Sequence, residues 1–169
     1  MQPILFVDLD GVLVDLAQGL SDILDYDFKK IDSKEFTNRY YEFVDGLTNG
    51  ELLNFWINLP PTKDYLKIWK KVEHLQPMIL TAVGGSTISC EGKKAWCKKN
   101  LNLNSDRVFC SYNSSDKQNY ASSNSILIDD QSRNIKQFKE KGGHGIHHVH
   151  AGKTLKQLNK ILKKWDLSI

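Results

Sequence analysis

The sequence predicts an α/β fold in which a doubly wound parallel sheet carries a small helical cap, inserted after its first strand. Two observations lead to this fold. Short apolar runs of strand length alternate with segments of helical spacing, a pattern typical of parallel sheets covered by helices. Between the first and second of these runs, residues 25–74 show only helical patterns, with dense aromatic side chains.

Five strands are expected, each rich in the branched or aromatic apolar side chains that suit a buried strand. They lie at residues 4–7, 78–80, 107–110, 125–128 and 145–149. Right-handed crossovers between parallel strands bring the carboxyl ends of the strands to one edge of the sheet. Asp8, Thr81 and Asp129 each follow or end one of these runs, so we expect them to meet at that edge, where open α/β sheets bind ligands.

Helices are expected where apolar side chains recur at intervals of three and four residues. Outside residues 25–74 these segments are 16–24, which Asp15 is expected to cap, and 90–100, 116–121, 134–141 and 154–165. Within 25–74 we expect about three short helices. The pairs Asp32–Glu35 and Thr48–Glu51 have the spacing of capping boxes, and Thr62 is a third candidate cap. These segments divide the chain into a core, residues 1–15 and 76–169, and a helical cap, residues 16–75.

Composition places the chain among ordinary globular proteins. Its 169 residues are enough for one domain with a real core, and it is 40% apolar and 25% charged. A net charge of +3 is too mild to argue for a nucleic acid or a membrane partner. We find no apolar run of transmembrane length and no leader sequence at the N-terminus, so a cytoplasmic location is expected. Cys90, Cys97 and Cys110 are odd in number and lack metal-type spacing, which favours reduced thiols.

The acids at the strand ends point to a divalent cation. Asp8 and Asp10 follow the first apolar run directly, and Asp129 and Asp130 follow the fourth. Burying several carboxylates at the end of a core strand is costly unless a cation lies between them. Hard cations prefer oxygen ligands, and Mg²⁺ is often held by carboxylates together with a phosphate. The sequence therefore predicts a Mg²⁺ site at this edge of the sheet.

The segment Asp-Leu-Asp-Gly-Val-Leu at residues 8–13 resembles the first motif of the haloacid dehalogenase superfamily. Thr81, Lys117 and the pair Asp129–Asp130 stand where this superfamily carries its remaining motifs, so the resemblance covers nearly the whole chain. It implies a Rossmann-like core under a cap, Mg²⁺ as the cofactor, and a phosphoric monoester hydrolase that works through an aspartyl-phosphate.

The resemblance also implies a role for each motif residue. Asp8 is the expected nucleophile on phosphorus, and Asp10 the general acid and then the general base. The Thr81 hydroxyl and the backbone from Ala82 onward are expected to hydrogen-bond a phosphoryl oxygen, and Lys117 to neutralise phosphate and nucleophile. The four acids Asp8, Asp10, Asp129 and Asp130 are the expected metal ligands, Asp10 through its backbone.

Within the superfamily, the chain is most similar to 5'(3')-deoxyribonucleotidases. Phe55 and Trp56 are similar to the aromatic pair that these enzymes place against the nucleobase, and Phe28 is a further candidate for substrate binding. Lys93 lies in a segment similar to one that carries a phosphate-contacting lysine. The residues after Thr81 are Ala-Val, where such nucleotidases usually have Ser-Pro, and the cap is short.

These features predict a Mg²⁺-dependent phosphomonoesterase that acts on a small molecule, a nucleoside (deoxy)monophosphate. Alternatives within the same chemistry are sugar phosphates and polynucleotide 3'-phosphate ends. A non-catalytic binding module with this fold is a rival from a different class. So is a zinc-dependent regulatory protein built on the histidines, of which His144, His148 and His150 would share one face of a strand.

Overall fold

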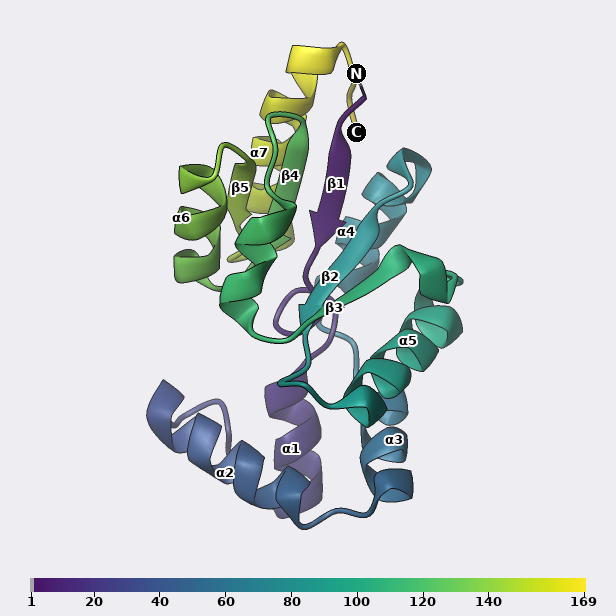
Figure 1. Cartoon of the computed structure of the whole chain (residues 1–169), viewed down its shortest axis with the longest axis vertical. Coiled ribbons are helices and arrows are strands. Elements are labelled where there is room, and N and C mark those ends of the chain that lie inside the picture. Colours follow the sequence, from purple (N-terminus) through teal and green to yellow (C-terminus); the bar gives the residue numbers. More distant parts are fainter. Residues whose placement is uncertain (1) are drawn as a thin grey trace.

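The computed structural model of the chain describes residues 2–169 and contains one five-stranded sheet, shown in Figure 1. Its strands all run parallel, in the order β3-β2-β1-β4-β5. Their bounds are β1 (Ile4–Val7), β2 (Met78–Ala82), β3 (Val108–Ser111), β4 (Ser125–Asp129) and β5 (His144–His147). Because β1 is central, with β2 and β4 as neighbours, the strand ends that carry Asp8, Thr81 and Asp129 are adjacent.

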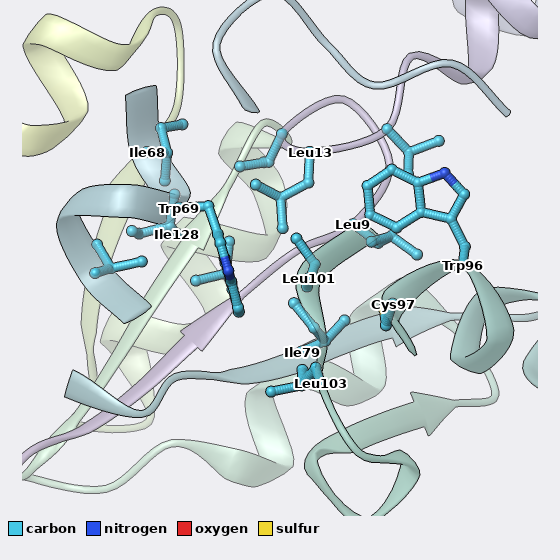
Figure 2. Close-up of a cluster of buried hydrophobic side chains, with 14 of the residues drawn as sticks. Leu9, Leu13, Ile68, Trp69, Ile79, Trp96, Cys97, Leu101, Leu103 and Ile128 are labelled. Atoms are coloured by element: carbon cyan, nitrogen blue, oxygen red, sulfur yellow. The ribbon is translucent and has the colours of Figure 1, made fainter. Parts of the chain in front are cut away.

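Both faces of the sheet are covered, which confirms the predicted doubly wound architecture. Side chains alternate along β1, so Leu5 and Val7 join one hydrophobic cluster and Phe6 joins another. Figure 2 shows part of the first and larger cluster. Helices α4 (Tyr65–Val72), α5 (Thr87–Leu101) and α7 (Ala151–Leu162) contribute to it. The second face packs against α6 (Ser132–Glu140) and the 3₁₀ segment η3 (Ser114–Tyr120).

The regular secondary structure of the insertion after β1 is helical. It contains α1 (Leu16–Leu24), α2 (Ser33–Asp45), α3 (Asn49–Asn58), α4 and the 3₁₀ segment η1 (Glu73–Leu75). Helices α1, α2 and α3 lie beyond the carboxyl ends of the strands, whereas α4 returns alongside the sheet (Figure 1) and contacts α7. This arrangement puts three helices next to the edge where the polar strand ends meet.

The helix caps follow the sequence except at Thr62 and at Glu35, whose side chain pairs with Arg39 and does not complete the capping box predicted with Asp32. The side chains of Asp15 and Asp32 accept hydrogen bonds from the first backbone N–H groups of α1 and α2, and Thr48 forms the predicted capping box of α3. The prediction for Thr62 is wrong. Its hydroxyl instead donates to the Val12 carbonyl at 2.7 Å, which ties the insertion to the chain leaving β1, and α4 begins three residues later.

The predicted reduced state is wrong for Cys90 and Cys110 and is confirmed for Cys97. Cys90 on α5 and Cys110 on β3 form a disulfide, with their Cα atoms 6.0 Å apart, and Cys97 is buried as a free thiol. The two partners are 20 residues apart in the sequence, and only the packing of α5 against the sheet brings them together. In the part of the chain that the structure describes, no helix is long and apolar enough to cross a membrane.

Candidate active site

Three neighbouring strands deliver polar side chains to one edge of the sheet. Asp8 continues β1, and its backbone N–H donates to the Ile128 carbonyl of β4 at 2.8 Å. Thr81 lies near the end of β2 and Asp129 at the end of β4. All three of these predicted side chains are buried, so their charges and hydroxyl must be satisfied within the protein.

Lys117 satisfies two of the buried acids at once. It comes from η3, is 2% exposed, and places its Nζ atom 2.7 Å from Asp8 Oδ2 and 2.7 Å from Asp129 Oδ2. Burial alone would lower the pKa of this ammonium group, but the Asp8 and Asp129 carboxylates outweigh burial and raise that pKa above its usual value. Lys117 therefore stays charged between the two acids.

A third acid joins this group. One ligand atom from each of Asp8, Asp129 and Asp130 lies within 4.8 Å of the others. Burial and the neighbouring Asp129 raise the pKa of Asp130 to about 6, and burial raises the pKa of Asp8 well above its usual range, with Lys117 opposing the rise. Three crowded carboxyl groups with a single lysine between them leave excess negative charge.

The surroundings of these acids fit a small cation. Asp129 is oriented by the Gln131 backbone N–H, at 2.7 Å, and by the Asn134 amide, at 3.1 Å. The Asn134 Oδ1 atom is buried without a hydrogen-bond partner among residues 2–169. Gly11 adopts φ +75°, and a Cβ atom at this position would overlap the Asp130 carboxyl group. The donors are all oxygen atoms, as hard cations prefer.

Lys93 organises the other half of the site. It is 1% exposed, and its Nζ atom lies 2.5 Å from Asp10 Oδ2, 2.9 Å from Thr81 Oγ1 and 2.7 Å from the Ala82 carbonyl oxygen. The same ammonium lies 4.4 Å from the ring centroid of Trp56, within the range of a cation–π contact. Asp10 therefore pairs with Lys93, while Asp8 and Asp129 pair with Lys117.

Two cavities meet at Asp10. The acid cavity, about 570 Å³, is lined by Asp8, Lys117 and Asp130, among others. The tyrosine cavity, about 530 Å³, is lined by four aromatic residues, Tyr40, Tyr41, Trp56 and Tyr112, and also by Lys93. Asp10, Leu16, Ala82 and Ser114 border both cavities.

Helix α2 lines both cavities with one face. Ser33, Phe36 and Thr37 border the acid cavity, and Tyr40 and Val44, one and two turns further along, border the tyrosine cavity. The helix has no fully buried residue. A ligand in either cavity would therefore contact a helix that is only lightly packed against the rest of the chain.

The structure brings most of the predicted residues together, but not Phe28 or Phe55. Phe28 packs edge-on against Phe36 and Tyr26, and Phe55 packs edge-on against Phe43 and Trp56. Both are buried in the hydrophobic cluster and border neither the acid nor the tyrosine cavity. As a correction to the expectation, these rings form packing contacts in the insertion: Phe55 lies on the buried face of α3, and Phe28 lies in the turn between α1 and α2.

The histidines are not gathered into a metal site. His144 contacts the Ser123 carbonyl, His147 the Asp130 carbonyl and His148 the Thr154 hydroxyl, while His150 caps α7. The one group of potential metal ligands in residues 2–169 is formed by Asp8, Asp129 and Asp130. The zinc alternative therefore finds no support in the geometry.

Sequence reasoning missed several residues that border the cavities or orient an acid, among them Asn134, Tyr40, Ser114 and Arg133. Asn134 follows Asp129 by five residues, and a polar residue one turn into the helix after an acid pair is a signal that could have revealed it. Tyr40, Ser114 and Arg133 gave no such signal. Their side chains border the tyrosine cavity only because of how α2, η3 and α6 pack around it.

Comparison with known proteins gives a fold. No family model and no curated protein matches the chain. A haloacid dehalogenase family enzyme from Bacteroides thetaiotaomicron, solved as a magnesium complex, is 16% identical with a TM-score of 0.51; the match covers 93% of this chain and 98% of that one. The chain has the haloacid dehalogenase fold.

Two further structures share this fold with similar coverage. A phosphoserine phosphatase in its apo form is 14% identical, with a TM-score of 0.55 and coverage of 96% of this chain and 98% of the other. A hydrolase from Pseudomonas syringae is 10% identical, with a TM-score of 0.51 and coverage of 94% and 90%. At these identities the likeness concerns the fold, and the chemistry must be argued from the site.

Proposed function

We propose that this protein is a Mg²⁺-dependent phosphomonoesterase of the haloacid dehalogenase type. The observation that carries the proposal is Lys117, which bridges Asp8 and Asp129 beside a third acid. A buried carboxylate that borders a cavity and is paired with a lysine, with a second acid paired to its own lysine, suits nucleophilic attack on an anionic phosphate. The magnesium complex of the Bacteroides thetaiotaomicron enzyme, which shares the fold, supports the choice of metal.

In the proposed reaction Asp8 attacks phosphorus, and the bond between phosphorus and the leaving oxygen breaks. Asp10 donates a proton to that oxygen and so releases an alcohol. Water then attacks the aspartyl-phosphate while Asp10 takes up a proton, and Asp8 is restored with release of inorganic phosphate. Lys117 and Lys93, together with the Thr81 hydroxyl, offset the negative charge that gathers on the phosphoryl oxygens.

Asp8, Asp129 and Asp130 would hold the metal ion. The Asp10 side chain is engaged by Lys93 and stands apart from these three acids, so Asp10 would contribute to the metal site only through its backbone. When bound, Mg²⁺ supplies positive charge that lets an anionic phosphate approach an ionised carboxylate.

We further propose that residues 16–75 act as a cap and that the substrate is a nucleoside (deoxy)monophosphate. Tyr40, Tyr41, Trp56 and Tyr112 line the tyrosine cavity next to Asp10, and stacking of a base on such rings contributes about 1–3 kcal/mol per base. Helix α2 borders both cavities and would exclude water from the reacting groups. Sugar phosphates and 3'-phosphorylated oligonucleotides are the alternatives.

The test is phosphate release from a panel of phosphomonoesters, with Mg²⁺ and with EDTA. The panel contains thymidine and uridine monophosphates, sugar phosphates, a 3'-phosphorylated oligonucleotide and p-nitrophenyl phosphate. We expect turnover only with Mg²⁺, and a loss of at least about 1,000-fold in Asp8→Asn. Asp22→Asn, an exposed acid on α1, is the matched control and should keep wild-type activity. Turnover in EDTA, or in Asp8→Asn at near wild-type rate, would overturn the proposal.

A further inference from the structure

Arg133 borders the tyrosine cavity from the side of the core. It lies in the first turn of α6, four residues after Asp129, and one guanidinium nitrogen lies 3.4 Å from the Ser114 hydroxyl of η3. Asn113, Ser114 and Ser115 border the cavity beside it. The part of the cavity wall around Arg133 is thus formed by one arginine and a short run of polar side chains.

The charges around this cavity leave Arg133 without an acidic partner. Two acids, Asp10 and Asp45, and two cations, Lys93 and Arg133, border it. Asp10 is paired with Lys93. Among residues 2–169, Arg133 forms no ion pair with Asp45 or with any other carboxylate. A guanidinium held by one weak hydroxyl contact keeps most of its five donors free.

The position of Ser114 indicates that Arg133 would lie next to the leaving group of a bound phosphomonoester. This serine borders both cavities, so it stands between the acids that would act on a phosphate and the rings of the tyrosine cavity. Arg133 borders the tyrosine cavity and not the acid cavity. A group bound to Arg133 would therefore belong to the part of the ligand beyond the reacting phosphate.

We propose that Arg133 forms a binding site for a second anionic group, so that the preferred substrate is a phosphomonoester with a further phosphate or carboxylate on its leaving group, such as a nucleoside bisphosphate in place of the simple monophosphate. This inference rests on the proposed function, because the reacting phosphate is assigned to the acid cavity. A planar guanidinium matches both anions in bidentate geometry, and the free serine hydroxyls can donate to the same oxygens. Lys93 and Lys117 are not available to the second anion, because each pairs with a carboxylate and would also contact the reacting phosphate.

The test measures binding and so does not depend on turnover. Asp8→Asn protein with Mg²⁺ is titrated calorimetrically with two ligand pairs, whose members differ by one anion. The first is thymidine 5'-monophosphate against thymidine 3',5'-bisphosphate, and the second is glycerol 3-phosphate against 3-phosphoglycerate. In at least one pair the member with the second anion should bind about tenfold more tightly. The pair that shows the preference distinguishes phosphate from carboxylate.

Three variants complete the design. Adding Arg133→Gln should reduce the preference to within about twofold, and Arg133→Lys should keep part of it. Lys136→Gln removes an exposed cation from the same helix and should leave the preference intact. No preference in either pair, no binding of any ligand, or equal weakening of both members by Arg133→Gln would overturn the inference. A retained preference in a wild-type protein that lacks phosphatase activity would overturn the proposed function alone.

Discussion

Lys93 and Lys117 divide the electrostatics of the site between them. Each is almost fully buried, and removing a lysine from water is costly unless carboxylates compensate for the lost hydration. Lys117 compensates Asp8 and Asp129, whereas Lys93 compensates Asp10 and also binds the Thr81 hydroxyl. The proposed nucleophile and the proposed proton donor thus have separate cationic partners, which lets their environments differ although only Leu9 lies between them.

Tyr40 adds a donor to the same region. Burial, together with the negative charge of Asp10, raises the pKa of its phenol well above the usual value, so the hydroxyl remains a donor at every assay pH. We expect Tyr40→Phe to lower kcat/KM for phosphomonoesters by about tenfold, the value of one lost hydrogen bond. Because this hydroxyl does not ionise between pH 6 and pH 9, the pH profile should keep its shape.

The control for this prediction is Tyr120→Phe. Tyr120 packs against Phe6 and Phe109 on the second face of the sheet and borders neither cavity. Steady-state kinetics from pH 6 to pH 9 should show an unchanged kcat/KM for this variant. An equal loss in both variants would mean that Tyr40 contributes to packing and not to the site.

The residues of the site differ in how far the sequence could predict them. Asp8 and Asp129 were predictable because Asp8 directly follows a buried strand and Asp129 ends one, so the fold alone fixes where they lie. Lys93 could be named only as a candidate, since twenty lysines look alike until a helix turns one of them inward. Arg133 depends on the packing of α6 against η3, which no local pattern encodes.

At the scale of elements, the contact between α3 and α5 couples the insertion to the core. Gly92 on α5 lies against Trp56 on α3, and a Cβ at this position would overlap the Cβ of Trp56. Trp56 also donates from Nε1 to Ser89 Oγ at 2.9 Å and lies under the Lys93 ammonium. The close approach of α3 and α5 therefore fixes the position of Lys93, which pairs with Asp10.

We expect Gly92→Ala to lower the free energy of unfolding by about 1–2 kcal/mol. The overlap outweighs the better helix propensity of alanine. Gly50→Ala on α3 is the matched control, because nothing lies within 4 Å of a Cβ there, and it should raise stability by about 0.5–1 kcal/mol. Urea unfolding of both variants measures the difference. A rise in stability in both variants would show that α3 and α5 do not approach as closely as the structure indicates.

The order of elements could be predicted because each one has a local signal. The strand β1 is a contiguous apolar run, and the capping box of Thr48 and Glu51 marks the start of α3. The expected start at residue 90 lies three residues beyond the start of α5 at Thr87, because its Ser86 cap lies in a Gly-rich loop that hides the boundary. Thr62 has the residue type of a cap, but a distant backbone carbonyl binds its hydroxyl.

At the scale of the whole molecule, the insertion and the core share one hydrophobic cluster. It runs without a break from Val7 in β1 to Leu158 in α7 and includes Phe28 and Trp56 from the insertion. Removing the insertion would expose the apolar surfaces of α5 and the sheet edge. The proposed cap is therefore attached to the core by packing and not by a linker, and its lightly buried part is α2.

The disulfide between Cys90 and Cys110 joins α5 to β3, the strand at one edge of the sheet. It closes a loop with a sequence separation of 20, and loops of this size stabilise a fold by about 3 kcal/mol through the entropy of the unfolded chain. We therefore expect reduction by dithiothreitol to lower Tm by about 6–12 °C, at about 2–4 °C per kcal/mol for a chain of this length. Thermal unfolding with and without reductant measures this shift.

Cys97 is an internal reference for this prediction, because it lies outside the disulfide and reductant should not change it. Burial raises the pKa of its thiol to about 12, so it stays protonated and should react slowly with iodoacetamide in the folded protein. The folded, oxidised protein should carry no alkylated cysteine and the reduced protein two, at Cys90 and Cys110. Cys90→Ala/Cys110→Ala should unfold at the same temperature with or without reductant. Rapid alkylation of Cys90 and Cys110 before reduction would mean that both are free thiols. Packing alone would then hold α5 against β3.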